Sequence, residues 1–487
     1  MEKYLIKNKT TMYTFITAMI SYIIVYGFEL THFTLSIDEE PMDNFAQTLS
    51  AGRWGHALLR HYILPEPYVP FFTLMLAIII LSATSALSAK YLMLSRLQSM
   101  SFAIALAAIP QMAYQLEFSN QSDTIAISMF CSVASLVSLN KGSLKGCITF
   151  IILTIVSLSI YQSIFLFAAS LLCVWIAVSA IKSEMTFNVA LKKVVLFSTL
   201  TLAALMLDAT LSKLVASHYN VMISGYLSAI VGWGKSDLNQ VLNNLFSFIR
   251  SYFTFNAAFG MNSFPLVVIP LMAIIVGAIL KRKSTTLIIF ASIAVLLSAF
   301  LLNLAIGTGL PPRAMTQIPV VFAGIFIIAV VFYNYNISAL YVSVILLAVG
   351  ASASNKLFYS DYMARQADNQ LSSQLINTIY LKYPSIDLSK TPVFFYGSFT
   401  PFNSWRIPTA DVFGASFFEW DGGNNQRMYK YLSAANIADL KSPDTAQVEK
   451  SRLMGESLPA WPNRDAVALV DGVVIIKLSN KLSDYNK

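Results

Sequence analysis

Long apolar runs alternate with short polar connections over the first 351 residues of the chain. A helix that crosses a membrane needs about 20 mainly apolar residues. Eleven runs come near or above that length, at about 11–28, 69–89, 99–116, 123–139, 147–160, 163–181, 194–212, 264–280, 285–305, 316–333 and 337–351. The pattern predicts a mainly α-helical, polytopic membrane domain of about 11 transmembrane helices over residues 1–351. No small-residue cleavage site follows the first run, which we therefore interpret as a retained span.

Composition agrees with a membrane protein. Hydrophobic residues make up 56% of the 487 residues and charged residues only 12%, whereas a soluble globular protein has about 25% charged residues. The net charge of +8 comes mostly from basic residues between the runs, and no basic-aromatic stripe indicates nucleic acid. A soluble protein class is therefore excluded.

The basic residues predict the orientation of the chain. With the amino terminus in the cytoplasm, the basic connections all fall on the cytoplasmic side, as the positive-inside rule requires. These residues are Lys90, Arg96, Lys141, Lys145, Lys182, Lys192, Lys193, Lys281, Arg282 and Lys283. The opposite connections hold most of the acids, and an odd number of spans leaves the carboxyl terminus outside.

A change in composition after residue 351 predicts a second domain over 352–487. Residues 353–383 have helical spacing, whereas Val393–Gly397 and Val412–Phe418 are rich in β-branched and aromatic residues, as strands are. Asp471-Gly472 lies between two short apolar runs and favours a tight hairpin turn. We expect an extracytoplasmic α/β domain.

Two outer loops, 29–68 and 213–263, are longer than a connection requires, and long loops in compact proteins are often functional. The first contains two helix-compatible pieces broken at Gly52, of a kind that lies in the membrane interface. The alternative is that these loops are solvated and have no role.

An acidic cluster, Asp38-Glu39-Glu40, follows the first span. An ionisable group at a membrane boundary can be a proton relay, an ion site or a catalytic base. Desolvation beside Ile37 and repulsion between the acids would raise the pKa of a carboxyl here. Such a base can take the proton of a hydroxyl that attacks a sugar, while cations stabilise a departing phosphate.

Several cations on the predicted outer face are candidates for a phosphate site. They are Arg53, Arg60, Lys235, Arg250 and Arg313. The last follows Pro311-Pro312, and the planar guanidinium group suits phosphate oxygens. Each of these residues has the alternative role of anchoring to lipid headgroups.

Tyr161-Gln162 lies where two runs meet and is either a sugar-binding pair or an interfacial turn. Asp208 lies within an apolar run near its outer end, where function and simple solvation are both open. The four histidines lack zinc-ligand spacing, and no phosphate-binding glycine loop or nucleophile elbow is present in the sequence.

The order of these features resembles the GT-C membrane glycosyltransferases. Within that class the chain is similar to the serotype-converting O-antigen glucosyltransferases, the type II Gtr family often carried by phages and prophages. The motifs that carry the likeness are Asp38-Glu39-Glu40, Gly52-Arg53-Trp54-Gly55, Tyr161-Gln162, Pro311-Pro312-Arg313 and the ending from Trp461-Pro462 to Leu478.

The resemblance implies a bacterial inner-membrane enzyme with a periplasmic carboxyl-terminal domain. It would move glucose from undecaprenyl-phosphate glucose to a sugar of the lipid-linked O-antigen repeat on the periplasmic face. Asp38 would be the general base, with Glu39 or Glu40 as substitutes, and Arg53 and Arg313 would hold the donor phosphate. Trp54, Tyr161 and Gln162 would contact lipid or sugar. No metal is expected to be required, although the acidic cluster has the ligands to bind a divalent ion.

Two other classes stay open. A flippase or transporter for a lipid-linked sugar would show internal repeats and charges at mid-membrane, and we find no repeat. An O-antigen polymerase also has long outer loops, but the folded carboxyl-terminal domain and the acids after the first span favour transfer of a single sugar.

Overall fold

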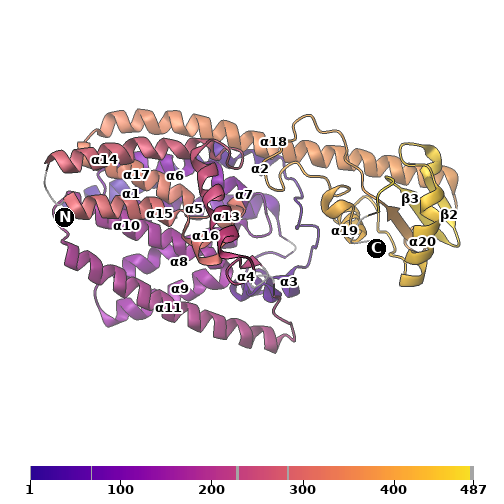
Figure 1. Ribbon diagram of the computed structural model, residues 1–487, viewed down its shortest axis with the longest axis horizontal. Coiled ribbons are helices and arrows are strands. Elements are labelled where there is room, and N and C mark those ends of the chain that lie inside the picture. The colour runs from indigo at the N-terminus through magenta and orange to yellow at the C-terminus, as the bar shows by residue number, and fades with distance from the viewer. Residues whose placement is uncertain (1, 67, 226–229, 282–284, 483–487) are drawn as a thin grey trace. The chain divides into compact units, whose positions relative to one another are not determined.

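The computed structural model describes residues 2–66, 68–225, 230–281 and 285–482. Helices contain 68% of the residues and strands 3%, which confirms the mainly helical class (Figure 1). Arg282 and Lys283, which the sequence places on the cytoplasmic side, lie outside the described residues.

The chain forms two compact units. The first comprises residues 1–31 and 44–355, and the second comprises residues 32–43 and 356–487. The short segment 32–43, which sequence reasoning assigned to an outer loop of the membrane domain, is therefore part of the second unit. This segment carries Asp38, Glu39 and Glu40.

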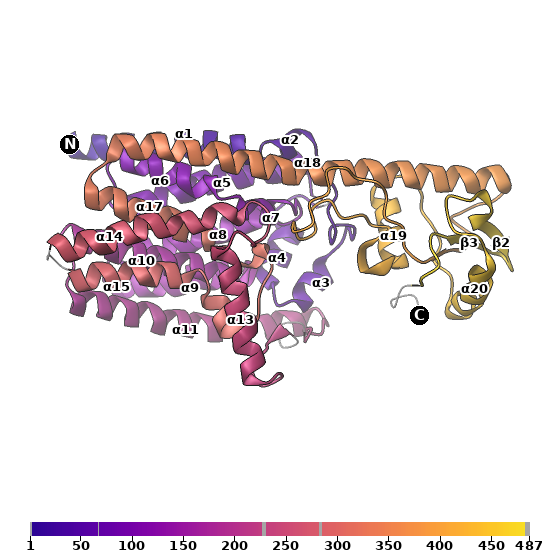
Figure 2. The same cartoon turned by 45° about the horizontal axis from the view of Figure 1, so that its top comes forward.

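The first unit is a bundle of long helices (Figures 1 and 2). A helix lies at every predicted apolar run: α1 (Glu2–Tyr26), α5 (Pro70–Tyr91), α6 (Arg96–Ala108) with α7 (Ala113–Leu116), α8 (Ser122–Leu139), α9 (Leu144–Ile160), α10 (Phe165–Ile181), α11 (Phe187–His218), α14 (Val268–Lys281), α15 (Thr285–Ser298) with α16 (Leu301–Ile306), α17 (Ile318–Tyr333) and α18 (Asn336–Lys382). The last continues without a break into the second unit, so the predicted boundary near residue 352 lies inside one helix.

Six helices in the described part of the chain are long and apolar enough to cross a membrane: 70–91, 122–139, 162–181, 187–218, 261–280 and 336–382. Three apolar helices, 144–160, 285–298 and 318–333, are shorter. These helices indicate a membrane protein. The number of eleven spans stays a prediction.

Small residues allow the helices of the bundle to approach closely. Ser128 on α8 hydrogen-bonds Ser157 on α9, and Ser170 on α10 bonds Ser298 on α15 at 2.7 Å. A Cβ atom at Gly350 would lie 1.7 Å from the Ala108 carbonyl oxygen. Contacts of this kind are typical of helices packed in membranes.

Basic residues gather at one end of the bundle. Arg96 lies over the ring of Tyr13 at 3.7 Å, and Lys182 donates to the Met93 carbonyl at 2.6 Å. Lys193 reaches the side chain of Asn140 at 3.5 Å. The connections that the positive-inside rule places on one side of the membrane therefore meet in space.

Short helices occupy the other end. They are α2 (Phe28–Thr31), α3 (Phe45–Ser50), α4 (Trp54–Tyr62), η1 (Pro110–Met112), η2 (Gln162–Ile164), α13 (Leu238–Phe253), η3 (Met261–Val267) and η4 (Pro312–Ala314). Gly52, with φ of +75°, separates α3 from α4, which confirms the predicted pair of helical pieces and the break between them.

The second unit contains a three-stranded sheet in the order β1-β3-β2, with β1 (Val393–Tyr396) parallel and β2 (Val467–Val470) antiparallel to β3 (Val473–Lys477). Val470 pairs with Val473 across Asp471 and Gly472, both at positive φ, so the predicted hairpin is confirmed. Phe394, Tyr396, Val473 and Ile475 form a core cluster against α20 (Thr445–Ser457). Helix α19 (Asn425–Ala434) completes the unit.

The predicted strand over Val412–Phe418 is wrong. This segment is buried but forms turns, because side chains bind its backbone N–H groups. Gly414 donates to Asp361 at 3.0 Å and Phe417 donates to Asp368 at 3.1 Å. Both acids lie on α18, and they replace the neighbouring strand that a sheet would supply.

Candidate functional site

Arg53 immediately precedes α4, and its guanidinium group lies over the ring of Tyr161, 4.6 Å from the centroid. Tyr161 is buried at the point where α9 ends and η2 begins. A cation over an aromatic face is held by the ring quadrupole. This contact fixes the guanidinium group without using a carboxylate, so its positive charge is not neutralised by Tyr161.

Tyr161 also reaches the segment that carries Arg313. Its hydroxyl donates to the Arg313 carbonyl at 3.5 Å. From the other side, Gln111 donates to the Pro312 carbonyl at 2.7 Å, and Gln115 donates to the Arg313 carbonyl. Tyr161 therefore contacts the guanidinium group of Arg53 and the backbone of Arg313, whose own guanidinium group lies over the ring of Phe118, 5.4 Å from the centroid.

The segment that leads into α4 is held from two directions. Gln162 Nε2 donates to the carbonyls of Gly52 at 3.2 Å and of Ala51 at 3.4 Å. Trp54 Nε1 donates to Asp208 Oδ1 at 2.9 Å. Asp208 is buried on α11, and its carboxylate has a protein partner. The alternative interpretation, that Asp208 is simply solvated near the end of its helix, is therefore wrong.

Close packing sets the position of α4 against α9. A Cβ atom at Gly55 would lie 2.0 Å from Ser159 Oγ, so only glycine fits there without movement of one helix. His56 Nδ1 is 2.8 Å from Thr124 Oγ1 on α8. Burial, followed by the charges of Arg60 and Arg53, lowers the pKa of His56 to about 3. The imidazole is therefore neutral in the folded protein at neutral pH.

Arg60 is not available to bind a substrate phosphate. It is buried and pairs with Asp123 at 2.5 Å, and it donates to the Asn120 carbonyl at 2.7 Å. Its role in the structure is to attach the end of α4 to the start of α8. Arg250, by contrast, is exposed on α13.

In the second unit the acidic cluster forms a tight turn. Glu39 N–H donates to the Ser36 carbonyl at 3.0 Å, and Asp38 has a φ of +80°. That is the conformation of the third residue of a type II turn, where glycine or asparagine is preferred. Glu40 accepts from the Asp38 N–H at 2.8 Å, and the buried Glu39 accepts from the Ser36 N–H at 3.0 Å.

Arg427 on α19 binds this cluster. Its guanidinium group contacts Glu40 at 2.6 Å, Asp38 at 2.9 Å and Asp421 at 2.6 Å. Burial alone would lower the pKa of Arg427, but the hydrogen bond to Asp421 and the charges of Glu40 and Asp38 raise it. Arg427 is therefore a permanent cation. Nothing in the sequence pattern singled out this residue.

The acids of the cluster differ in access to solvent. The Asp38 side chain is 41% exposed and that of Glu40 only 3%, and Glu39 is fully buried. Burial raises the pKa of the Glu40 carboxyl, against the opposing effect of Arg427, in the direction expected from the sequence. Asp38 is the acid that an outside molecule can reach.

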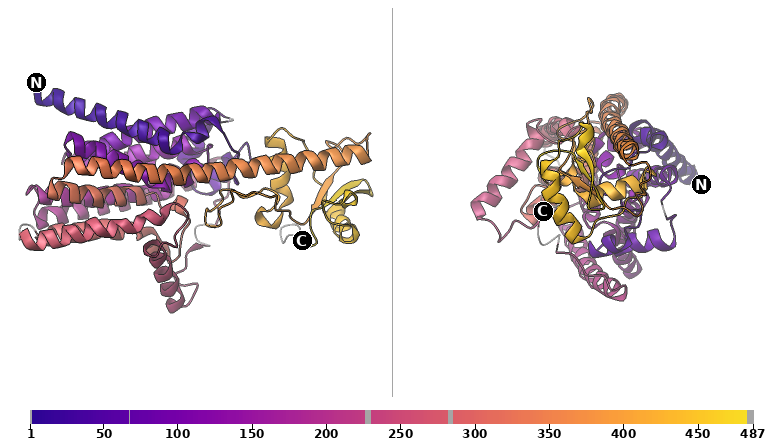
Figure 3. Two further views of the ribbon diagram at one scale, coloured as in Figure 1. Left: turned by 90° about the horizontal axis from the view of Figure 1, so that it is seen from above. Right: turned by 90° about the vertical axis from the view of Figure 1, so that its right-hand side faces the viewer.

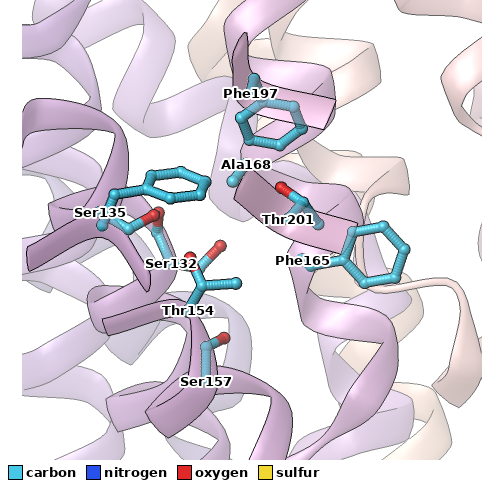
Figure 4. A pocket seen from close by; sticks show the side chains of 9 residues that line it. Ser132, Ser135, Thr154, Ser157, Phe165, Ala168, Phe197 and Thr201 are labelled. Atoms are coloured by element: carbon cyan, nitrogen blue, oxygen red, sulfur yellow. The ribbon is translucent and has the colours of Figure 1, made fainter. Parts of the chain in front are cut away.

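Figure 4 shows a cavity between α8, α9, α10 and α11, lined by serine, threonine and phenylalanine side chains. Its volume of about 10 Å³ is room for about one water molecule, whereas pockets for small organic ligands measure about 300–1,000 Å³. It is no sugar site. In the part of the chain that the structure describes, no group of three or more His, Cys, Asp or Glu side chains is arranged to hold a metal ion.

The apolar bundle, with Arg53 over Tyr161 and Arg313 over Phe118, defines a polytopic helical membrane protein with cationic, aromatic contacts at one end. The profile of the family described as glucosyl transferase GtrII matches residues 27–332, and the chain belongs to this family. The resemblance found in the sequence is thereby confirmed, and the chain is a glucosyltransferase by family. Comparisons with curated proteins and with solved structures gave no significant match.

Proposed function

We propose that the protein transfers glucose from undecaprenyl-phosphate glucose to a sugar of the lipid-linked O-antigen repeat. The reaction takes place on the periplasmic face of the bacterial inner membrane and converts the serotype. Family membership supports glucosyl transfer. The observation that carries the donor assignment is that Tyr161 contacts the guanidinium group of Arg53 and hydrogen-bonds the backbone carbonyl of Arg313. Each guanidinium group lies over an aromatic ring, Arg53 over Tyr161 and Arg313 over Phe118, and a guanidinium group suits the oxygens of a lipid phosphate.

In the proposed reaction an acceptor hydroxyl oxygen attacks the anomeric carbon of the donor glucose. The bond between that carbon and the phosphate oxygen breaks, and undecaprenyl phosphate leaves with the electron pair. Arg53 and Arg313 stabilise the developing negative charge. Trp54, Tyr161 and Gln162 contact the sugar or the lipid.

The proton of the acceptor hydroxyl passes to a carboxylate, for which we propose Asp38. Arg427 binds only Oδ1 of this residue, and the side chain is the most exposed of the three acids. Glu39 and Glu40 are the substitutes. Arg427 binds Oδ1 of Asp38, and the other carboxylate oxygen, Oδ2, receives the proton as the sugar bond breaks.

We propose that no metal ion is required, because two cations in the first unit provide the charge that a metal would supply to the phosphate. Transfer in membranes treated with EDTA tests this directly, and activity restored only by added magnesium or manganese would contradict it.

The experiment that tests the function is analysis of lipopolysaccharide from cells with and without the gene. Extra glucose on each repeat supports single-sugar transfer. A changed chain length would instead indicate a polymerase, and loss of surface O-antigen a flippase. The Arg313→Lys variant is the matched control, because it should insert into the membrane and add little glucose. A reporter that is active only in the periplasm, fused after Lys487, tests the topology.

A further inference from the structure

Helix α13 crosses the end of the bundle in the first unit. Figures 2 and 3 show that it runs across the direction of α14 and α15 and projects to the side. Asp237 caps its first turn by accepting the Asn239 N–H at 3.1 Å. If the long apolar helices cross the membrane, a helix with this direction lies along the membrane surface.

The surface of α13 has two adjacent apolar stripes. Successive residues of a helix are about 100° apart, so Val241, Leu245 and Tyr252 fall on one stripe, and all three are buried. Leu238, Leu242 and Phe246 fall on the next stripe and are 60%, 49% and 67% exposed. The protein itself therefore buries one apolar stripe and leaves the adjacent one exposed.

The remaining face of α13 is polar and exposed. It includes Asn239, Asn243, Ser247 and Arg250. Arg250 follows Phe246 by one turn, so its guanidinium group lies at the border between the exposed apolar stripe and the polar face. A wide apolar arc beside a cation is the pattern of helices that bind anionic membrane surfaces.

The buried stripe attaches α13 to the segment that carries Arg313. The Tyr252 hydroxyl donates to Met315 Sδ at 3.3 Å, and its ring contacts Phe300 at 5.5 Å between centroids. Gly309 packs against Phe248, since a Cβ atom there would lie 2.7 Å from that ring. The depth of α13 therefore sets the depth of the Arg313 segment.

We infer that α13 is an interfacial helix whose exposed stripe, Leu238, Leu242 and Phe246, inserts among the acyl chains of the bilayer. Arg250 meets the headgroup phosphates, and the polar face points to water. The partner is the lipid surface itself, because the stripe adjoins an apolar bundle and a cation borders it. The helix thereby holds the Arg313 segment at the level of lipid headgroups.

The test uses the full chain in vesicles of phosphatidylethanolamine and phosphatidylglycerol, with the three native cysteines replaced by alanine. An environment-sensitive fluorophore is attached at Phe246→Cys or Leu242→Cys, and at Asn243→Cys as the control on the polar face. Lipids with a nitroxide on the acyl chain should quench the labels at 246 and 242 at least twofold more than the label at 243. Aqueous iodide should give the reverse order.

Two outcomes would overturn the inference. Equal iodide quenching at all three positions would place the stripe in water. Energy transfer between labelled copies, lost on dilution with lipid, would show that a second copy covers the stripe. Because these readouts do not use glucose transfer, their failure is separate from failure of the proposed function. Similar quenching of the labels at 242 and 246 shows that the result does not come from local misfolding in one variant.

Discussion

Trp54 and Asp208 form a hydrogen bond of 2.9 Å between the helix that follows Arg53 and the long apolar helix α11. A buried carboxylate on such a helix needs a partner, and here the partner is the neighbour of a proposed phosphate ligand. The bond fixes the entry of α4 and hence the backbone from which Arg53 extends.

Removal of this bond should reduce transfer. Asp208→Ala should lower the rate on the order of tenfold, the effect of one hydrogen bond to a charged group. Asp208→Asn should retain most activity, because its carbonyl oxygen still accepts the indole N–H. In a Trp54→Phe background Asp208→Ala should add little. Independent, additive losses in this double-mutant cycle would contradict a role for Asp208 through Trp54.

Transfer should be sensitive to loss of the planar guanidinium group at Arg53 and at Arg313. Arg53→Lys and Arg313→Lys keep the charge but lose two-point binding of phosphate, so transfer per inserted protein should fall roughly tenfold to a thousandfold. Arg96→Lys is the matched control, because Arg96 also lies over a tyrosine, Tyr13, but at the opposite end of the bundle. Full activity in both test variants would contradict phosphate binding and would favour the alternative role, in which these arginines anchor to lipid headgroups.

Asp38→Asn should lose glucosylation by roughly a hundredfold or more, because the amide cannot accept a proton at neutral pH. Glu39→Gln and Glu40→Gln should each do less, since both acids are buried and bind the backbone of the turn. Product is measured per amount of membrane-inserted protein. An inactive Glu40→Gln variant together with an active Asp38→Asn variant would assign the general base to Glu40. Full activity of all three variants would refute a catalytic role for the cluster.

The backbone at Asp38 predicts opposite effects on stability and activity. A non-glycine residue at φ of +80° is strained by about 1–2 kcal/mol, whereas a half-exposed ion pair contributes about 0–1 kcal/mol. Both Asp38→Gly and Asp38→Asn lose the ion pair, and glycine relieves the strain most fully, so Asp38→Gly should be inactive yet no less stable than Asp38→Asn. The measurement is the melting temperature of the two purified variants. A clearly lower melting temperature of the glycine variant would show that the turn is not strained.

His56 predicts a loss of stability in acid. Its pKa is lowered to about 3 in the folded protein, whereas the unfolded chain binds a proton near pH 6.5. The unfolded state therefore takes up more protons below that pH, and stability decreases as the pH falls from 7 towards 3. His56→Asn keeps a partner for Thr124 and does not titrate, so its melting temperature should change less between pH 7 and pH 5. Equal slopes for the two proteins would contradict the buried neutral state.

Sequence reasoning predicted the helices, and the breaks between them, where a local pattern of residues determines the backbone. The apolar runs specify helices through their length, and Gly52 and Pro311-Pro312 mark breaks where polar side chains leave the bundle. Arg53, Trp54, Tyr161, Gln162 and Arg313 are therefore candidates. In the first unit Tyr161 contacts Arg53 and the backbone of Arg313, and Gln162 bonds the Gly52 carbonyl. Their roles in binding donor or acceptor stay predictions.

Other features depend on contacts that no local pattern encodes. Arg427 and Glu40 are 387 residues apart, and an isolated arginine on a short polar helix gives no signal. Gln111 and Gln115 lie in a run that was interpreted as apolar, yet their amides hold the Pro312 and Arg313 carbonyls. Val412–Phe418 has the composition of a strand, but Asp361 and Asp368 bind its N–H groups.

The pairing of Asp38 with Arg427 has a consequence for biosynthesis. The two residues are separated by 389 positions. Because a ribosome adds about 5–20 residues per second, Arg427 is synthesised roughly 20 to 80 s after the acidic turn. During that interval the three carboxylates are already synthesised while their partner is not yet made. The second unit therefore cannot finish folding until translation is nearly over, and a fragment that starts at residue 356 would lack a segment on which that unit is built.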